Sequence, residues 1–496
     1  MIWLLLIGIF TYIIVQRSVA NLTRTPVWLL WLVMMIPAFV WAGWISTYRN
    51  SGDETALLLV LTGAFVVSSV LYWFLVQWGR PAKPDAASAK SQPPAAAAAI
   101  SPLAEPRPPV RTLDKEEEAN LQNCFPWSVF YLQGIEQRPQ ALICRGQLRT
   151  SAEVAYKTVQ ENVESYFRDR FLVVLQEGMN GKPFFVLVPN PQAKGAGAKP
   201  TKMTRPLLAA GMLIATFLTM VIAGAMIDKP LAQREFPQSF AAFQTGLPYA
   251  LALLAFLGVH ELGHYFVARR YGIRTTLPYL IPVPPNAAFP IGTFGAFIQS
   301  RSPYPNRQSL FDVAVAGPLA GLVVAVPIAL WGLAHSTPVA LTAESSLLNF
   351  ESFDPSRSLL ISLLSKLALG NLLTAGQGLN LHPVAIAGCL GVLFTALNLT
   401  PIGQLDGGHM VHAMFGQRGG AMIGQIARLL ILGLVFIQRD LLLWAVFLFL
   451  IPSVDEPALN DVSELNNGRD FLGLFALALL IVIVLPAPQA ITQFLF

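Results

Sequence analysis

Charged residues are scarce in this chain, and their scarcity limits what kind of protein it is. Asp, Glu, Lys and Arg make up 12% of the 496 residues, whereas hydrophobic residues make up 54%. A soluble domain carries about 25% charged residues. Several apolar stretches reach the roughly 20 residues that a bilayer-spanning helix needs. The composition therefore argues against a soluble protein and predicts a polytopic membrane protein embedded in a lipid bilayer.

The chain also has few cysteines and only a small net charge. The three cysteines, Cys124, Cys144 and Cys389, show no C-x-x-C spacing, so they give no disulfide framework. The formal net charge is only +5, and the basic residues are spread over loops. We interpret this excess as topology and lipid-surface charge and expect no nucleic-acid partner. The start of the chain, MIWLLLIGIFTYIIVQR, lacks a basic beginning and a small-residue cleavage site, which favours a retained helix over a signal peptide.

Four regions follow from the pattern of apolar runs and breaks. The N-terminal region, 1–80, contains three expected transmembrane helices, near 2–16, 27–46 and 56–78. A Pro- and Ala-rich linker follows at 81–112. A small soluble α+β domain is expected at 113–200 and a membrane-embedded core at 201–496.

Residues 113–190 have the pattern of a small folded domain. SVFYLQGI and ALICRGQL suit strands, and SAEVAYKTVQENVESYFRDR suits an amphipathic helix. The helix would place Ala155, Val159, Val163 and Phe167 on one face. Two further apolar strands flank Asn180-Gly181, a dipeptide typical of a hairpin turn.

The core is predicted to consist of helices that cross the membrane or reach into it. The expected spans lie near 206–226, 244–268, 311–334, 384–402, 420–437, 441–452 and 470–490. If the spans alternate, the basic residues that flank them fall on one side, which should be cytoplasmic or its topological equivalent. These include Arg17, Arg24, Arg80, Lys83, Lys90, Lys194, Lys199, Lys202, Arg205, Arg269, Arg270 and Arg274.

HELGH, residues 260–264, interrupts an apolar run with three ionisable groups. On a helix His260 and His264 are i and i+4, so both imidazoles project from one face and can bind one tetrahedral metal ion, usually zinc. Glu261 lies beside them and can serve as a general base. A single buried histidine is often only a packed residue, but the chain has only six, and ionisable groups in a membrane span indicate function. We therefore predict a metal site here.

A catalytic zinc site needs a third protein ligand and an open position. NLTPIGQLDGGHM, residues 398–410, supplies the best candidate, Asp406, after an apolar span that should end on the same side of the membrane as His264. Two alternatives remain: Asp406 is an ordinary loop cap, or His409 is the ligand instead. His335, His382 and His412 are interpreted as loop or helix-end residues.

The two motifs in this order resemble the site-2 protease family of intramembrane zinc metalloproteases. The stretch GTFGAFIQSRSPYPNRQSLFDVAVAGPLAG, residues 292–321, is also similar to that family, and the resemblance covers roughly 205–490. It is nearer to the cyanobacterial and chloroplast branch that includes the ethylene-dependent gravitropism-deficient and yellow-green proteins. It implies one zinc ion held by His260, His264 and Asp406, with Glu261 as the catalytic base and Asn398 in contact with substrate.

The resemblance also implies regulated intramembrane proteolysis of a membrane-protein substrate, either single-span or a tethered factor. The membrane would be the plasma or thylakoid membrane, with the active site near its cytoplasmic side. The loop near 335–383 is too short for the PDZ domain that many bacterial members insert. Oligomeric state does not follow from the sequence.

The Pro- and Gly-rich stretch 273–300 predicts non-helical backbone inside the core. Such backbone is tolerated at membrane depth only where protein or a cavity surrounds it. We expect a re-entrant β-hairpin whose GTFGAFIQ part pairs with an extended substrate, with Gly292 and Gly295 permitting close backbone approach. The alternative is a packed loop without substrate contact. The expected fold class is thus a polytopic all-α membrane protein with a re-entrant β-hairpin in its protease core, plus a small soluble α+β domain.

Overall fold

The structure is a computed structural model, and it divides the chain into two units, Met1–Pro106 and Arg107–Phe496. It describes residues 8, 11–12, 25–47, isolated positions between 60 and 78, 114–138, 140–178, 181–190, 205–227, 236–285, 290–300, 302–342, 345–347, 349–452 and 454–495. The predicted linker at 81–112 and most of the helices expected near 2–16 and 56–78 lie outside the described residues.

The first unit contains a bent helix pair, α2 (Val27–Met34) and α3 (Ile36–Thr47). Helices α2 and α3 meet at 41°, because Pro37 has no N–H and its ring conflicts with the carbonyl one turn earlier. That carbonyl, on Val33, accepts a hydrogen bond of 2.7 Å from Ser68 Oγ instead. A side chain therefore satisfies the polar group that proline leaves unpaired.

The second unit begins with a small α+β domain. It has helices α6 (Lys115–Asn123) and α7 (Ala152–Phe167), a 3-10 turn η1 (Arg168–Arg170), and strands β1 (Phe130–Arg138), β2 (Ala141–Leu148), β3 (Phe171–Glu177) and β4 (Pro183–Pro189). The strands form one antiparallel sheet in the order β1-β2-β4-β3. The buried face of α7, at Ala155, Val159 and Val163, packs in the same core as Leu142 and Phe185 of the sheet. The 3.6-residue period of the sequence predicted this face.

The rest of the second unit is mostly helical. Its helices are α8 (Pro206–Ile227), α9 (Phe240–Gln244), α10 (Leu247–Arg270), α11 (Arg307–Ala334), α12 (Leu359–Leu369), α13 (Pro383–Leu399), α14 (Asp406–Val435), α15 (Leu442–Leu450), α16 (Asn467–Val484) and α17 (Gln489–Leu495), with 3-10 turns η3 (Pro355–Arg357), η4 (Gly370–Leu372) and η5 (Arg439–Leu441). Among the described residues, five helices are long and apolar enough to cross a membrane, or six if α2 and α3 form one span. The chain is an integral membrane protein.

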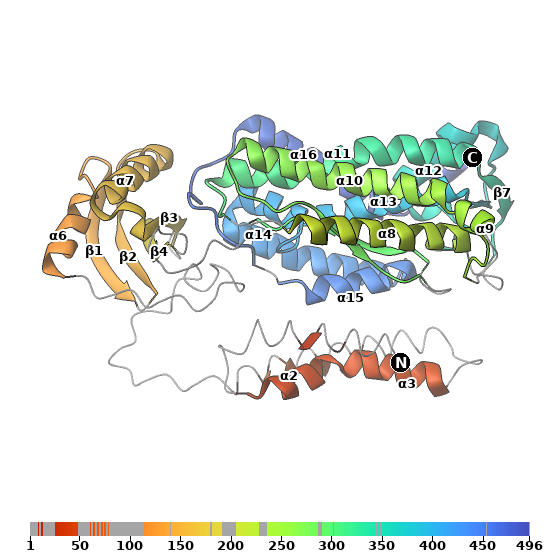
Figure 1. The fold of residues 1–496 in the computed structure, drawn as a ribbon, viewed down its shortest axis with the longest axis horizontal. Coiled ribbons are helices and arrows are strands. Elements are labelled where there is room, and N and C mark those ends of the chain that lie inside the picture. The colour runs from red at the N-terminus through yellow and green to blue at the C-terminus, as the bar shows by residue number, and fades with distance from the viewer. Residues whose placement is uncertain are drawn as a thin grey trace. The chain divides into compact units, whose positions relative to one another are not determined.

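Helices α10, α11 and α13 form the centre of this core and lie side by side in Figure 1. Their contact surfaces are fully buried and combine bulky and small residues, as Phe256 of α10, Ala325 and Ala329 of α11 and Val392 of α13 show. Small residues let helix backbones approach closely where lipid gives no hydrophobic drive for association. The three helices therefore form a rigid frame for side chains that point between them.

Two short β-pairs interrupt the helices. Strands β5 (Tyr279–Pro282) and β6 (Thr293–Phe297) pair antiparallel within the stretch where the sequence predicted a hairpin, and β7 (Thr337–Ala340) pairs with β8 (Gln377–Asn380). The β5–β6 pair lies against α8, where Thr219 Oγ1 donates a 2.7 Å hydrogen bond to the Gly292 carbonyl.

The region from 335 to 383 is more than the loop that the sequence suggested. It contains α12, whose buried residues Ile361, Leu364 and Leu369 belong to the main core. Ser358 caps this helix by accepting a hydrogen bond from the Ile361 N–H. With 11 residues, α12 is shorter than the roughly 20 that a membrane span needs, so it was not among the expected spans.

Candidate metal centre

His260 and His264 lie in the C-terminal half of α10, where the sequence predicted them on one helical face. His260 is 3% exposed. The Nε2 atoms of the two rings are 3.3 Å apart. His264 Nδ1 donates a 2.7 Å hydrogen bond to the carbonyl of Val313 in α11. A neutral imidazole that donates from Nδ1 keeps its lone pair on Nε2, so this contact turns the metal-binding atom of His264 toward His260.

Two glycines of α11 make the room for these rings. A Cβ atom on Gly317 would lie 2.1 Å from His264 Nε2, and one on Gly321 would lie 3.2 Å from His260 Nδ1. Any larger residue at 317 would occupy the place of the imidazole. The AGPLAG stretch is thus the surface against which the two histidines pack.

Asp406 reaches the histidines from α14, of which it is the first residue. A carboxylate in the first turn interacts favourably with the helix dipole. Its Oδ2 atom lies 3.5 Å from His260 Nε2 and 3.3 Å from His264 Nε2. The next residue, Gly407, has no room for a side chain, since a Cβ there would lie 2.0 Å from the Leu399 carbonyl at the end of α13. This contact holds the start of α14 against α13.

The three donor atoms have the spacing of a tetrahedral zinc site. Zinc binds nitrogen and oxygen at about 2.0–2.2 Å, so its ligand atoms stand about 3.3–3.5 Å apart. The three separations here, 3.3, 3.3 and 3.5 Å, lie in that range. Among the residues that the structure describes, His260, His264 and Asp406 are the one group of three or more such side chains whose ligand atoms all lie within 4.8 Å of one another. The residues present fit a zinc ion.

Glu261 and Asn398 complete the surroundings of the cluster. Glu261 is 6% exposed and interacts electrostatically with both histidines and with Asp406. The amide Nδ2 of Asn398, the penultimate residue of α13, lies 3.3 Å from His260 Nε2. Both residues therefore lie beside the cluster, and their roles stay predictions.

The two glycines expected to contact substrate have different surroundings. Gly292 has a φ of 83° and packs on α8, because a Cβ there would lie 2.7 Å from the Thr219 carbonyl. Gly295 has a φ of 94°, and a Cβ there would meet nothing within 4 Å. Only Gly295 leaves open space next to the backbone of β6.

The remaining histidines of α14 are placed differently from the sequence interpretation. His412 is not a loop or helix-end residue, because it is 1% exposed and both of its ring nitrogens contact carboxylates, those of Asp455 and Asp461. His409 Nδ1 lies 2.8 Å from Asp455 Oδ2 and lies outside the three-residue cluster. Their partners are more than 40 residues further along the chain, so periodicity gave no sign of them.

Tyr304 is a neighbour of the site that the sequence did not single out. Its ring centroid lies 6.2 Å from that of His409. Burial, followed by the negative charges of Asp455 and Asp406, raises the pKa of Tyr304 above its ordinary value. The phenol is therefore a neutral hydrogen-bond donor at physiological pH.

Two family models and several curated proteins are similar to parts of this chain. Residues 248–437 match the model of peptidase family M50, and 119–195 match the EGY3 middle domain. The chain is 28% identical over 372 residues to the probable zinc metalloprotease EGY2, chloroplastic, of Oryza sativa subsp. indica, with 73% of this chain and 65% of the relative covered. It is 34% identical over 242 residues to the probable zinc metalloprotease EGY1, chloroplastic, of Arabidopsis thaliana, with coverage of 48% and 43%.

A third relative, the probable zinc metallopeptidase EGY3, chloroplastic, of Arabidopsis thaliana, is 26% identical over 384 residues, which cover 73% of this chain and 65% of the relative. The matched part thus spans less than two thirds of each of these relatives, and less than half of the EGY1 protein. No solved structure matches the chain. Both the histidine pair of α10 and the aspartate of α14 lie within residues 248–437, the part of the chain that is similar to peptidase family M50, the family of site-2 proteases.

Proposed function

We propose that this protein is a zinc metalloprotease that hydrolyses peptide bonds within or near the transmembrane segments of membrane-protein substrates. The observation that carries the proposal is the tetrahedral spacing of His260 Nε2, His264 Nε2 and Asp406 Oδ2 beside the buried Glu261. The match of residues 248–437 to peptidase family M50 supports the same reaction. One zinc ion per chain suffices for this donor set.

The chain's own residues then have distinct roles. His260, His264 and Asp406 would hold the zinc ion, which when bound supplies a Lewis acid that polarises a peptide carbonyl. Glu261 accepts the proton of the attacking water and passes it to the leaving amine. The Asn398 amide lies next to His260, so it is suited to orient the substrate carbonyl by hydrogen bonding.

The substrate would bind as an extended strand along β6. A transmembrane helix must unwind before a peptide bond in it can be cleaved, and pairing with a strand edge replaces the lost backbone hydrogen bonds. Gly295 leaves open space, and Phe294 and Phe297 are 56% and 46% exposed. Gly292 serves this proposal indirectly, since its close contact with α8 anchors the start of β6. In this proposal β5 and β6 form a re-entrant hairpin.

The names of the relatives support a proposal for the biological setting. Their names place them in the chloroplast, which favours the thylakoid over the plasma membrane for this chain. Substrates would be single-span proteins or membrane-tethered factors. Cleavage near the cytoplasmic side, or its chloroplast equivalent, would release a soluble fragment in regulated intramembrane proteolysis. The residues 113–200 would form a separate soluble domain ahead of a protease core at 201–496.

The test is reconstitution of the full chain in liposomes with a single-span reporter. Zinc content and reporter cleavage are measured for the native chain, for protein treated with a chelator, and for a His264→Ala variant. We expect about one zinc per native chain, cleavage that chelation abolishes and zinc restores, and neither zinc nor cleavage in the variant. Cleavage by metal-free protein would refute the proposal.

A further inference from the structure

Helix α14, which carries Asp406, is broken soon after it begins. Gly416 has φ 77° and ψ 165°, so residues 406–415 form a short helix separate from the rest of α14. Carbonyls at the end of a helix lack partners inside it. Two of them accept from the buried Arg307 guanidinium: Nε lies 2.8 Å from the Ala413 oxygen and Nη2 lies 3.5 Å from the His412 oxygen. Contacts, and not continuity with a long helix, set the position of Asp406.

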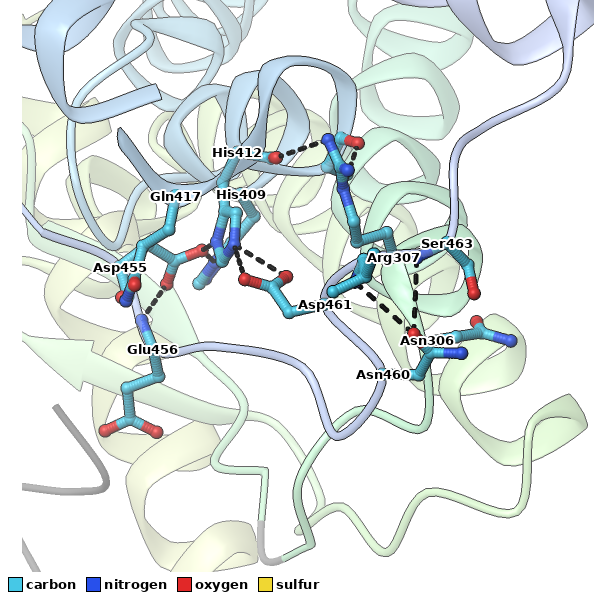
Figure 2. A network of polar contacts seen from close by, with 12 residues as sticks. Asn306, Arg307, His409, His412, Gln417, Asp455, Glu456, Asn460, Asp461 and Ser463 are labelled. Atoms are coloured by element: carbon cyan, nitrogen blue, oxygen red, sulfur yellow. Dashed lines mark hydrogen bonds and ion pairs between the residues drawn. The ribbon is translucent and has the colours of Figure 1, made fainter. Parts of the chain in front are cut away.

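The largest of these contacts is a buried network around His412 (Figure 2). Its Nδ1 lies 2.7 Å from Asp455 Oδ2 and its Nε2 lies 2.9 Å from Asp461 Oδ1. The three side chains are 1%, 4% and 5% exposed. With a carboxylate at each ring nitrogen, both nitrogens donate and the ring is an imidazolium between two anions. No nitrogen of His412 is left to bind a metal ion, so the role of this network is to hold the short helix in place.

Both aspartates belong to one segment, residues 455–461, which we name the strap. The strap lies between α15 and α16, and its backbone contacts the chain that enters α11. The Leu459 N–H donates to the Tyr304 carbonyl at 2.8 Å, and the Asn460 N–H donates to the Pro305 carbonyl at 3.0 Å. The strap thus connects the short helix of Asp406 to the start of α11, the helix whose glycines make room for the metal-binding histidines.

The strap also contacts the small domain. Leu175 in β3, an edge strand of the sheet, donates its N–H to the Leu459 carbonyl at 2.7 Å and accepts from the Asp461 N–H at 2.9 Å. Leu175 pairs with Asn460 as in a parallel sheet. Because Asp461 is also a partner of His412, one residue takes part in the contact with the small domain and in the contact with the metal-bearing helix.

We propose that the strap positions Asp406 against His260 and His264, and that the small domain acts on the metal centre through Leu175. His412 is the positioning residue, since the two aspartates of the strap contact the short helix of α14 through its ring. The inference rests on the proposed zinc site for its function. A change at the β3 edge, such as binding of a peptide strand in place of the strap, would then release the short helix and weaken the metal site.

The first experiment compares His412→Gln and Asp461→Asn in the full chain with Glu464→Gln, which neutralises an exposed acidic residue just beyond the strap. Two readouts are taken: the zinc dissociation constant, from competition with a chromophoric chelator, and hydrogen exchange of the amides of 406–415 in metal-free protein. We expect zinc affinity to fall about 10- to 100-fold, as for other partners that orient metal ligands, and exchange of 406–415 to accelerate. Glu464→Gln should change neither.

Folded His412→Gln and Asp461→Asn proteins with native zinc affinity and native exchange in 406–415 would overturn the positioning role. The exchange measurement needs no metal, so it decides the role of the strap even if the native chain binds no zinc. In that case the proposed function fails, and the exchange measurement alone decides whether the network around His412 holds the short helix in place.

The second experiment tests the link to the small domain. Leu175→Pro removes the N–H that Leu459 accepts, at a position where that N–H faces away from β4, while Gln133→Pro places the same residue at the bulge of the opposite edge strand, β1. Leu175→Pro should weaken zinc binding and speed exchange in 406–415, and should add little to His412→Gln when the two are combined. Results equal to those of Gln133→Pro would overturn the link.

Discussion

A Cβ atom on Gly317 would lie 2.1 Å from Nε2 of His264. The ring of His264, in α10, can therefore keep its position only if residue 317, in α11, is glycine. The two residues are 53 positions apart in the sequence and touch only because α10 and α11 pack side by side. The metal site therefore depends on helix packing as much as on its ligands.

Gly317→Ala should displace the His264 ring and weaken zinc binding by at least about tenfold, since outer contacts that orient metal ligands have effects of this size. The matched control is Gly258→Ala in α10, where a Cβ would meet nothing within 4 Å. It should leave zinc binding unchanged and favour the helix by up to about 1 kcal/mol. Chelator competition measures both, and equal affinities of the two variants would show that Gly317 does not set the ring position.

Asp406→Asn should weaken zinc binding by more than about 100-fold, because it removes a metal ligand itself and not only a residue that orients a ligand. Free zinc at 100 times its dissociation constant stabilises a native state by about 2.7 kcal/mol. We therefore expect zinc to raise the thermal midpoint of the native chain and to leave that of the variant unchanged. Asp470→Asn, in the first turn of α16, is the control. An undiminished zinc shift in Asp406→Asn would exclude Asp406 as a ligand.

Phe294→Ala should raise KM for a membrane reporter with little change in kcat, since the side chain would contact substrate and not the reacting atoms. Loss of such a contact costs about 1 kcal/mol or more, or about fivefold in KM. Leu251→Ala in α10 is the control, because both residues are 56% exposed. If the two variants had the same KM, substrate would not bind along β6.

Cys124 should react slowly with alkylating reagents in the folded small domain. Burial raises the pKa of its thiol to about 11, so at pH 8 about one thiol in a thousand is the reactive thiolate. A raised thiol pKa means that the reactive fraction grows about tenfold for each pH unit up to about 11, whereas an unfolded thiol, with a pKa near 8.5, is already partly ionised at pH 8. Mass spectrometry of labelled peptides, with and without denaturant, measures this. Rapid labelling of folded protein at pH 8 would contradict the buried placement.

The sequence predicted the features that depend on local spacing. The i, i+4 relation of His260 and His264 needs only a helix, and α10 provides it. The alternating and 3.6-residue patterns of 113–190 predicted the strands and helix of the small domain, which the structure contains. That Asp406 would approach the same point depended on a topology argument, and the structure brings the three side chains together.

Features that depend on distant contacts were not predictable in this way. The break at Gly416 has no signal that separates it from the other glycines of α14. His412 looked like a helix-end residue because the carboxylates that surround it come from the strap, which has no repeat or motif of its own. Pairing of a buried charge is a property of the tertiary fold, so its partners cannot be read from spacing.

Replacement of Glu261 by Gln tests the central claim most directly, because it removes a base and keeps the size of the side chain. Zinc content and cleavage of a single-span reporter are measured on the same purified samples of native and variant chain. We expect the variant to bind about one zinc and to cleave at least about 100-fold more slowly. Cleavage at the native rate by zinc-loaded Glu261→Gln would contradict the account.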